Sequence, residues 1–340
     1  MTPKRLTRKD SPKSKSSRRY IFFGIIILFF IITVTVILFN KKWDGISRFT
    51  IIIHNHTEDP LKGSLAVFSI EPKERKAVYM VFPYNTLFNV PYGYKSYMVS
   101  SIYKLGKLDS QRSAGKLLAK STEISLGLAI DGYLVMENSD FQYVYDNEAD
   151  FKKTKINNFS FIGGFKNIRR FLFGFKSVDT DMTLMDRFTL WNAIRKLRAD
   201  QISYIDLISN NILQDDQLSD GTSIKKINLD RFDISLSDDF QDTNIRAENI
   251  TLEIINATKQ ERLAAQFAMI LNRLGANVIS TNTSEEPFGD SCTLYGTENE
   301  IEKSWIVKKL NKLYDCMQIK KKDKNQQSEI RIVLGERFVK

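Results

Sequence analysis

The chain has 340 residues, of which 42% are hydrophobic and 26% are charged. This apolar fraction excludes a wholly disordered chain, and a content of two Cys and two His excludes a disulfide-rich scaffold and a zinc-finger array. Fifty basic against 40 acidic residues give a net charge of +10, which suggests a nucleic-acid partner if the charge is spread over the chain.

The positive charge is concentrated at the N-terminus. Residues 1–20 hold eight Lys and Arg with Asp10 as the sole acid, so they carry +7 and leave +3 for the rest of the chain. Residues 21–40 (IFFGIIILFFIITVTVILFN) contain no charged side chain, and about 20 helical residues span the roughly 30 Å of a bilayer core. We therefore expect a basic cytoplasmic tail, one transmembrane helix at 21–40, and residues 41–340 outside the cell membrane. The expected partner of the basic tail is the bilayer, and no nucleic acid is expected.

The nearest alternative for this segment is a cleaved signal peptide. The apolar core of a signal peptide has about 7–15 residues and is followed by a small-x-small cleavage site. Here the run is longer and leads into Asn40-Lys41-Lys42-Trp43. The pattern therefore favours an uncleaved anchor.

Strand and helix patterns alternate after the anchor and predict an α/β domain with a central mixed sheet over residues 41–213. Short runs rich in Ile, Val, Phe and Tyr predict strands at 49–56, 64–70, 76–82 and 130–137. Helices are predicted at 95–108, 110–126 and 183–200.

The composition changes at residues 214–248, which include eight Asp residues and are interpreted as an acidic connector. The Asp spacing does not match a calcium-binding loop, so a solvated acidic surface is favoured. Residues 249–340 are predicted to form a small α/β domain with a strand at 250–256, a helix at 259–274 capped by Gly275, and a closing strand, EIRIVLG.

Cys292 and Cys316 are the only cysteines, and both lie in this last domain. The predicted topology places them in an oxidising compartment, which favours a disulfide between them over two buried thiols. Such a bond would close a loop of about 25 residues and add roughly 3 kcal/mol of stability.

Two short patterns could carry chemistry in the first domain. His54 and His56 lie on one face of a predicted strand and could supply two metal ligands, but no third histidine exists, so two structural histidines are favoured and no metal is expected. Asp179-Thr180-Asp181 matches the D-x-D of anchored, metal-dependent glycosyltransferases. A triplet this short occurs by chance, and Asp is also favoured just before a helix, so this activity is the least favoured alternative.

The C-terminal residues resemble a known domain. ITLEIINAT, followed by KQERLAAQFAMILNRLGANVIS and the ending SEIRIVLGE, is similar to the LytR C-terminal domain of the LytR-CpsA-Psr (LCP) family of bacterial cell-envelope proteins. Asn256-Ala257 stands at the turn where Asn-Gly is usual in that domain. The order of basic tail, single span and extracytoplasmic α/β domain also resembles this family.

The first domain resembles the catalytic domain of the family more faintly, and the departures fall on its functional motifs. SLAVFSIEPKERKAVYMVFPYNT is similar to paired strands that end in Pro-Arg-Asp-Thr, but Tyr84 replaces the Arg and Asn85 the Asp. Leu61-Lys62-Gly63 stands where an Arg-x-Asp segment is expected. In DRFTLWNAIRKLR, Arg187 matches the first helix arginine, whereas Leu190-Trp191 replaces an Arg-Gln pair.

The resemblance implies a specific chemistry. In the family, arginines grip the pyrophosphate of a polyprenyl-linked glycan, an Asp holds magnesium, and the glycan is moved to the cell wall by phosphoryl transfer, which depends on cations and a metal. The departures predict a non-catalytic binding or scaffold protein without a cofactor, whose partners are a cell-wall glycan or a polyprenyl lipid. The alternative is an active glycan phosphotransferase that uses Mg²⁺ and the catalytic candidates Tyr84, Asn85, Asp186 and Arg187.

Overall fold

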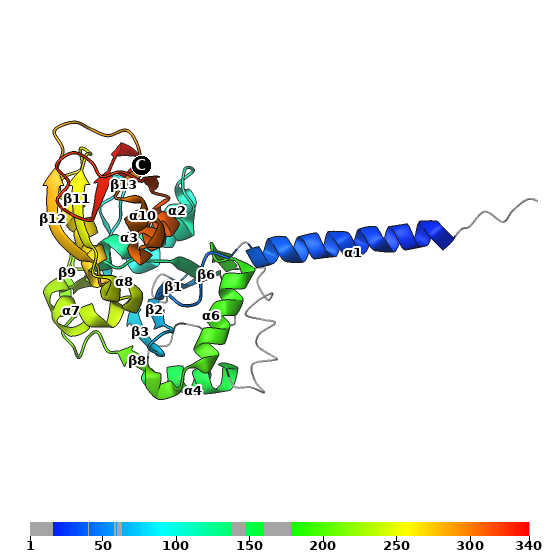
Figure 1. Ribbon diagram of the computed structural model, residues 1–340. Coiled ribbons are helices and arrows are strands. Elements are labelled where there is room, and N and C mark those ends of the chain that lie inside the picture. Colours follow the sequence, from blue (N-terminus) through cyan, green and yellow to red (C-terminus); the bar gives the residue numbers. More distant parts are fainter. Residues whose placement is uncertain are drawn as a thin grey trace, which may run out of the picture. The chain divides into compact units, whose positions relative to one another are not determined.

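Figure 1 shows the computed structural model, which describes residues 16–39, 41–57, 59, 63–137, 144, 147–159 and 178–339. The chain divides into two compact units, residues 1–41 and 42–340. The first unit contains helix α1 (Ser16–Phe39), whose side chains are described for residues 20–33 and are exposed. Among the described residues, no helix meets the length and apolarity required to cross a membrane.

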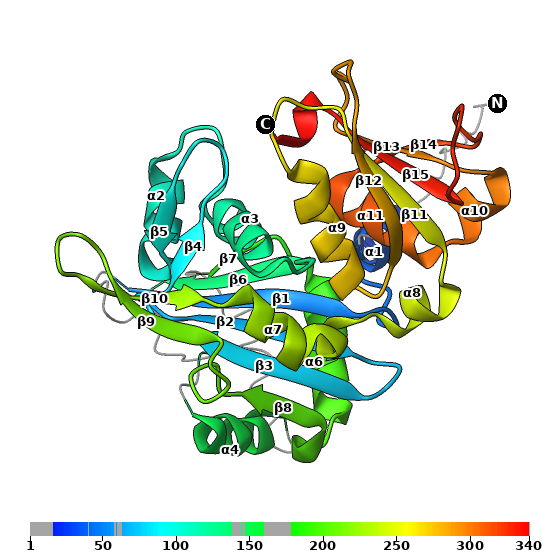
Figure 2. The same cartoon turned by 90° about the vertical axis from the view of Figure 1, so that its left-hand side faces the viewer.

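A mixed six-stranded sheet with the order β7-β6-β1-β2-β3-β8 forms the centre of the second unit (Figure 2). Its strands are β1 (Phe49–His56), β2 (Leu65–Glu71), β3 (Lys76–Phe82), β6 (Gly132–Glu137), β7 (Val178–Thr180) and β8 (Ile202–Ile205). Strand β1 pairs antiparallel with β2 and parallel with β6. The predicted mixed sheet is therefore confirmed, and the predicted strands agree with β1, β2, β3 and β6 to within two residues.

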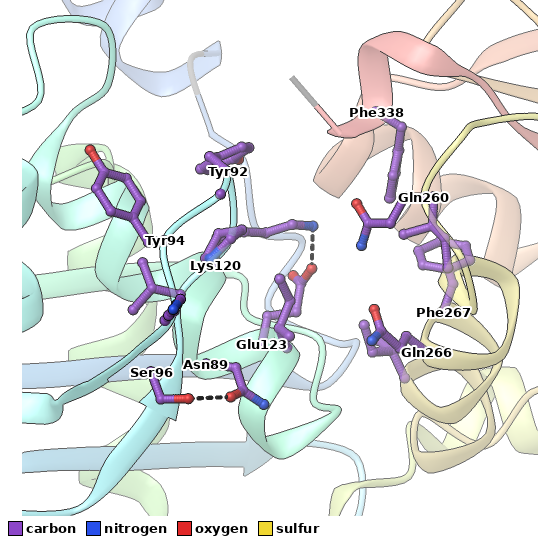
Figure 3. A pocket seen from close by; sticks show the side chains of 17 residues that line it. Asn89, Tyr92, Tyr94, Ser96, Lys120, Glu123, Gln260, Gln266, Phe267 and Phe338 are labelled. Carbon is purple, nitrogen blue, oxygen red and sulfur yellow. Dashed lines mark hydrogen bonds and ion pairs between the residues drawn. The ribbon is translucent and has the colours of Figure 1, made fainter.

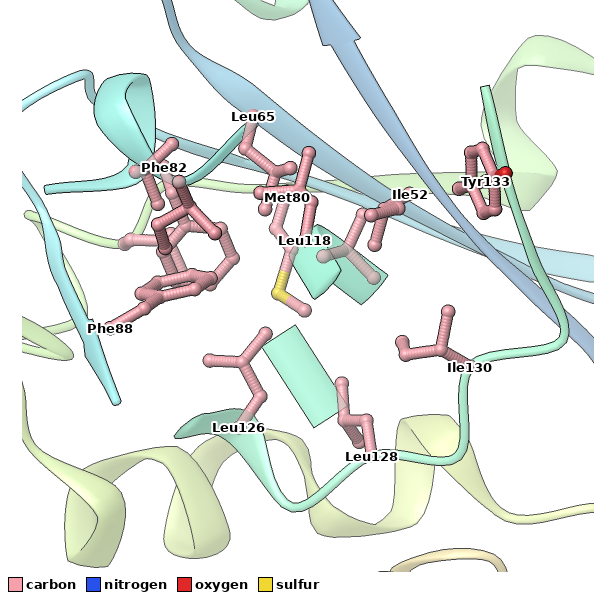
Figure 4. Close-up of a cluster of buried hydrophobic side chains, with 14 of the residues drawn as sticks. Ile52, Leu65, Met80, Phe82, Phe88, Leu118, Leu126, Leu128, Ile130 and Tyr133 are labelled. Atoms are coloured by element: carbon pink, nitrogen blue, oxygen red, sulfur yellow. The ribbon is translucent and has the colours of Figure 1, made fainter. Parts of the chain in front are cut away.

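Both faces of this sheet are covered, because successive residues of a strand point to opposite sides. Ile52, Val67 and Met80 are buried on the face covered by α2 (Val99–Leu108) and α3 (Ala114–Leu126), as Figure 4 shows for part of this core. The neighbouring residues Ile51 and Phe68 are buried on the face that carries α4 (Glu148–Phe159) and α6 (Leu184–Lys196). The result is a helix–sheet–helix sandwich.

A small two-stranded sheet lies beside α2 and α3. It consists of β4 (Leu87–Asn89) and β5 (Ser96–Met98), which pair antiparallel. The helix predicted over 95–108 begins only at Val99, because residues 96–98 form strand β5 and pair with β4.

The segment 214–248, predicted as a connector, is folded onto the six-stranded domain. It contains the β9 (Leu213–Gln217)–β10 (Ser223–Ile227) hairpin, α7 (Leu229–Leu236), the short helix η3 (Ser237–Phe240) and α8 (Thr243–Glu248). Ile224 and Phe232 are fully buried, and Phe240 is 3% exposed in the same core as α2 and α3. The interpretation as a connector was wrong, because the apolar positions between the Asp residues belong to a buried face.

Residues 249–338 form a second sheet with the order β12-β11-β15-β13-β14. Its elements are β11 (Thr251–Asn256), α9 (Leu263–Arg273), β12 (Asn277–Thr283), β13 (Cys292–Tyr295), α10 (Glu298–Lys303), α11 (Trp305–Tyr314), β14 (Met317–Ile319), β15 (Ile330–Leu334) and the short helix η4 (Glu336–Val339). The predicted first strand, helix and last strand all form. Gly275 has φ 94° directly after α9, as expected of a residue that ends a helix.

The two sheets are joined by buried ion pairs. Lys309 on α11 donates to both carboxylate oxygens of Asp131 at 2.7 Å and to the carbonyl oxygen of Arg48 at 2.8 Å. Lys312 adds a contact of 3.1 Å to Asp131. These contacts explain why residues 42–340 form one compact unit and are not two bodies joined by a connector.

Candidate functional site

The carboxyl end of β1 brings two histidine rings beside a tyrosine ring of α2. The ring centroids of His54 and His56 are 6.1 Å apart, and Tyr103 of α2 lies 4.9 Å from His56 and 6.2 Å from His54. In mixed and parallel sheets, the edge formed by the carboxyl ends of parallel strands is where ligands commonly bind. We refer to the group formed by His54, His56, Tyr103, Tyr133 and Asp179 as the strand-end cluster.

His54 is a neutral imidazole at neutral pH. Burial lowers its pKa to about 4, although a hydrogen bond of 3.0 Å between Nδ1 and the carbonyl oxygen of Ser64 acts in the opposite direction. Its buried Nε2 has no hydrogen-bond partner among the described residues. A Cβ added to Gly63 would lie 3.5 Å from His54 Cε1, so this neutral ring adjoins the position where the family resemblance places an acidic side chain.

Asp179 and Asp181 are held by protein donors. The Asp179 carboxylate accepts the hydroxyls of Tyr103 (3.1 Å) and Tyr133 (3.3 Å), and Asp181 Oδ1 accepts the backbone N–H of Tyr133 at 3.0 Å. Burial, together with the Asp179 charge, raises the pKa of Tyr133 to about 12 and keeps its hydroxyl protonated. Both carboxylates therefore accept hydrogen bonds from Tyr133, Asp179 from its hydroxyl and Asp181 from its backbone N–H.

Tyr84 and Asn85 form the turn after β3. The backbone N–H of Ser100 donates to the Tyr84 carbonyl at 3.2 Å, and a Cβ on Gly63 would lie 3.0 Å from Ser100 Cβ, so both departures from the family motifs adjoin Ser100. Asn85 is buried, and its side-chain amide donates to the backbone carbonyl of Ser223 at 3.3 Å. The backbone carbonyl of Asn85 accepts from the backbone N–H of Lys225. Asn85 thus fastens the β9–β10 hairpin to this turn.

Asp186 is a buried capping residue of α6. It forms a capping box with Thr183, while Oδ1 accepts the backbone N–H groups of Lys42 (2.9 Å) and Trp43 (2.7 Å). This geometry fixes the chain that enters β1 to the start of α6. Arg187, the next residue, is half-buried, and burial lowers its pKa. The four catalytic candidates therefore belong to two groups with different neighbours.

The strand-end cluster contains hydroxyl, imidazole and carboxylate groups, and its two tyrosine hydroxyls already donate to Asp179. Among the described residues, no group of three or more His, Cys, Asp or Glu could hold a metal ion. Sequence reasoning missed Tyr103 and Tyr133. The available signal was the helical spacing of Val99, Ile102 and Tyr103, which places Tyr103 on the buried face of α2.

A cavity lies elsewhere, between the sandwich and the C-terminal domain. It has a volume of about 390 Å³ and is bounded by the β4–β5 loop and α3 on one side and by α9 and η4 on the other (Figure 3). This size falls within the range of roughly 300–1,000 Å³ that is typical of small-ligand sites.

The C-terminal domain contains both features predicted from its sequence. The side chain of Asn256 accepts from Thr258 and donates to the carbonyl of Gln260, and the Ala257 N–H donates to the Leu334 carbonyl, so these residues form the turn after β11. Cys292 and Cys316 form a disulfide, with their Cα atoms 4.5 Å apart.

The comparison with protein families gives one match, over residues 249–338, to the family described as LytR cell envelope-related transcriptional attenuator. These residues are therefore similar to the LytR C-terminal domain. The match confirms the resemblance to LytR-type cell-envelope proteins that the sequence suggested. The comparison with curated proteins gave no match.

Several solved structures are similar to part of the chain. Bacillus subtilis TagV has 13% identity and a TM-score of 0.40, covering 55% of this chain and 93% of TagV. The LytR-CPS2A-psr family protein YwtF (TagT) with bound octaprenyl pyrophosphate lipid has 16% identity and a TM-score of 0.37, covering 57% and 90%. TagT bound to LIIa-WTA has 14% identity and a TM-score of 0.37, covering 57% and 91%.

Proposed function

We propose that this chain is a membrane-anchored protein of the LCP type that binds a glycan or a polyprenyl-linked glycan during cell-wall or surface-glycan assembly, without transferring it. In this proposal residues 21–40 cross the membrane once, the N-terminus is cytoplasmic, and residues 41–340 are extracytoplasmic. The absence of positive charge on Gly63, Tyr84 and Asn85, where the family resemblance expects pyrophosphate-binding and magnesium-binding groups, carries the proposal.

The chemistry at these positions supports binding rather than transfer. Phosphoryl transfer depends on cations that neutralise the charge developing on the transferred group. The ring beside Gly63 belongs to His54, which is neutral near pH 7, and the side chain of Asn85 is bonded to the β9–β10 hairpin. Asp186 is occupied by the backbone donors of Lys42 and Trp43.

The packing of the sandwich favours the glycan, and not the lipid chain, as the part of the ligand that this domain binds. The core between the sheet and the α2–α3 layer is filled by contacting apolar side chains, among them the fully buried Phe82, Phe88 and Leu118 (Figure 4). A lipid chain would have to displace such side chains, each of which contributes about 1.5–3 kcal/mol through burial. A sugar bound at a surface cavity requires no such displacement.

A transfer assay tests the proposal. The full chain in lipid nanodiscs is incubated with an oligosaccharide linked to octaprenyl pyrophosphate and an acceptor glycan, with and without Mg²⁺. We expect no Mg²⁺-dependent release of the lipid product from the wild type. Turnover that is lost in Arg187→Ala or Asp186→Asn, but retained in a variant of the exposed Arg195, would instead establish the phosphotransferase.

The topology is tested separately. Protease added outside spheroplasts is expected to digest residues 41–340 and to spare the basic tail. Protection of the whole chain would refute the proposed orientation.

A further inference from the structure

The cavity between the sandwich and the C-terminal domain is built by elements of both. The β4–β5 loop and α3 supply one wall, while the turn before α9, α9 itself and η4 supply the other. Figure 3 shows Gln260 and Gln266 across the cavity from Lys120 and Glu123. The cavity therefore depends on the C-terminal domain being docked against the sandwich.

Aromatic side chains give this cavity flat apolar surfaces. Tyr92, Tyr94, Phe267 and Phe338 line it. The guanidinium of Arg112 lies 3.9 Å from the ring centroid of Tyr92, and Phe267 and Phe338 pack edge-to-face at 5.4 Å. These contacts hold the rings in place before any ligand binds, which reduces the cost of ordering them on binding.

The polar groups of the cavity suit a polyol. They are Asn89, Lys95, Ser96, Lys120, Glu123, Gln260 and Gln266. Lys120 pairs with Glu123 at 2.5 Å, so the charge of each is balanced by the other, and the exposed Lys95 leaves the lining with one net positive charge. Amides both donate and accept hydrogen bonds, as hydroxyl groups do, whereas a polyanion would require several unbalanced cations.

The backbone on both walls is in a conformation that side chains seldom adopt. Tyr92 has φ 67° in the β4–β5 loop, and Arg262 has φ 60° at the start of α9. Non-glycine residues with positive φ are uncommon and cluster at binding sites, where the surrounding structure maintains the strain. Here the strained turn carries the Tyr92 ring that lines the cavity.

From the aromatic walls, the amides and the Lys120–Glu123 pair we infer that this cavity is a binding site for an oligosaccharide, recognised jointly by the sandwich and the C-terminal domain. Sugar rings stack their C–H faces on aromatic rings, whose faces are electron-rich, while their hydroxyls bond to the amides and to the Lys120–Glu123 pair. The inference deepens the proposed binding function, but it does not depend on the absence of transfer.

Calorimetric titration of the full chain in detergent micelles tests the inference. The titrants are cellotetraose, maltotetraose and N-acetylglucosamine tetramer, with inorganic phosphate in a separate titration. We expect at least one tetrasaccharide to bind and phosphate not to compete with it. Tyr92→Gly removes the ring while suiting the positive φ, and Gln266→Ala removes one amide; each is expected to weaken binding at least tenfold.

Two variants outside the cavity serve as controls. Gln217→Ala on β9 and Phe188→Ala on α6 change exposed residues and should leave the affinity unchanged. Failure of all three tetrasaccharides to bind, or binding that is equal in the cavity and control variants, would overturn the inference. Saccharide binding together with Mg²⁺-dependent transfer would overturn only the non-catalytic part of the proposed function.

Discussion

Replacing Lys309 by Met should destabilise the fold strongly, because it would leave a buried carboxylate without its main partner. The side chains of Lys309 and Asp131 are 4% and 0% exposed. Burial of Asp131 opposes its ionisation, but Lys309 and Lys312 outweigh this effect and hold its pKa below the usual value. Asp131 is therefore ionised at neutral pH, whereas burial lowers the pKa of Lys309 against the opposing effect of Asp131.

The expected magnitude follows from what remains after the substitution. Removing one partner of a buried ion pair costs about 3–5 kcal/mol. Asp131 would keep Lys312 at 3.1 Å and the backbone N–H of Thr50 at 2.9 Å, so we expect a loss of about 3 kcal/mol. At roughly 2–4 °C per kcal/mol for a chain of this size class, the midpoint of thermal unfolding should fall by about 6–12 °C.

Thermal unfolding of the full chain in detergent, followed by circular dichroism, measures this effect. Lys308→Met is the matched control, because Lys308 is the exposed neighbour of Lys309 on α11 and should change the stability by less than about 0.5 kcal/mol. Asp131→Asn combined with Lys309→Met removes both charges, and should be less damaging than Lys309→Met alone. Equal effects of the Lys308 and Lys309 substitutions, or purely additive effects in the double variant, would refute the reasoning.

Three further predictions concern other parts of the fold. The pKa of His54 is about 4 in the folded chain and 6.5 when the ring is solvated, so below pH 6.5 the unfolded chain takes up a proton that the folded chain does not. The free energy of unfolding, measured by urea titration, should therefore fall by about 3 kcal/mol between pH 6.5 and 4. This loss should disappear in His54→Gln. Replacing Cys292 and Cys316 by Ser should lower the free energy of unfolding by roughly 3 kcal/mol, measured by the same titrations. Reduction of the wild type followed by alkylation should add two labels, and labelling without reductant would contradict the disulfide. Gly115→Ala should lower the unfolding midpoint by a clash worth about 1–3 kcal/mol, since its Cβ would lie 2.0 Å from a buried tyrosine ring, whereas Gly289→Ala meets no atom within 4 Å and should have little effect.

Local patterns in the sequence predicted most of the elements. Residues 49–56 were predicted as a strand from their β-branched and aromatic content, and they form β1 with Ile51 and Ile52 on opposite faces. The helical spacing of Leu263, Phe267 and Ile270 predicted α9, and these residues are buried in the C-terminal core. Such predictions succeed because a period of two or of 3.6 residues is encoded by near neighbours in the chain.

The candidate site depended on contacts that near neighbours do not encode. Tyr103 and Asp179 lie 76 residues apart in the chain, and Lys309 and Asp131 lie 178 apart, so neither pair has a local pattern. The apolar side chains within residues 214–248 were obscured by the surrounding Asp residues, although Ile224 and Phe232 are fully buried. The cavity lined by α3 and α9 was also missed, because its two walls come from segments that are far apart in the chain.

The position of β15 sets an order on the synthesis and folding of the chain. Residues 330–334 lie between β11 and β13 in the C-terminal sheet and pair with both. During translation, β11, α9 and β13 therefore emerge from the ribosome before β15, which lies between β11 and β13 in the sheet. The sheet domain with α2 and α3 can form as the chain is made, whereas the C-terminal sheet, and with it the wall of the cavity formed by α9, can close only after residue 334 has left the exit tunnel.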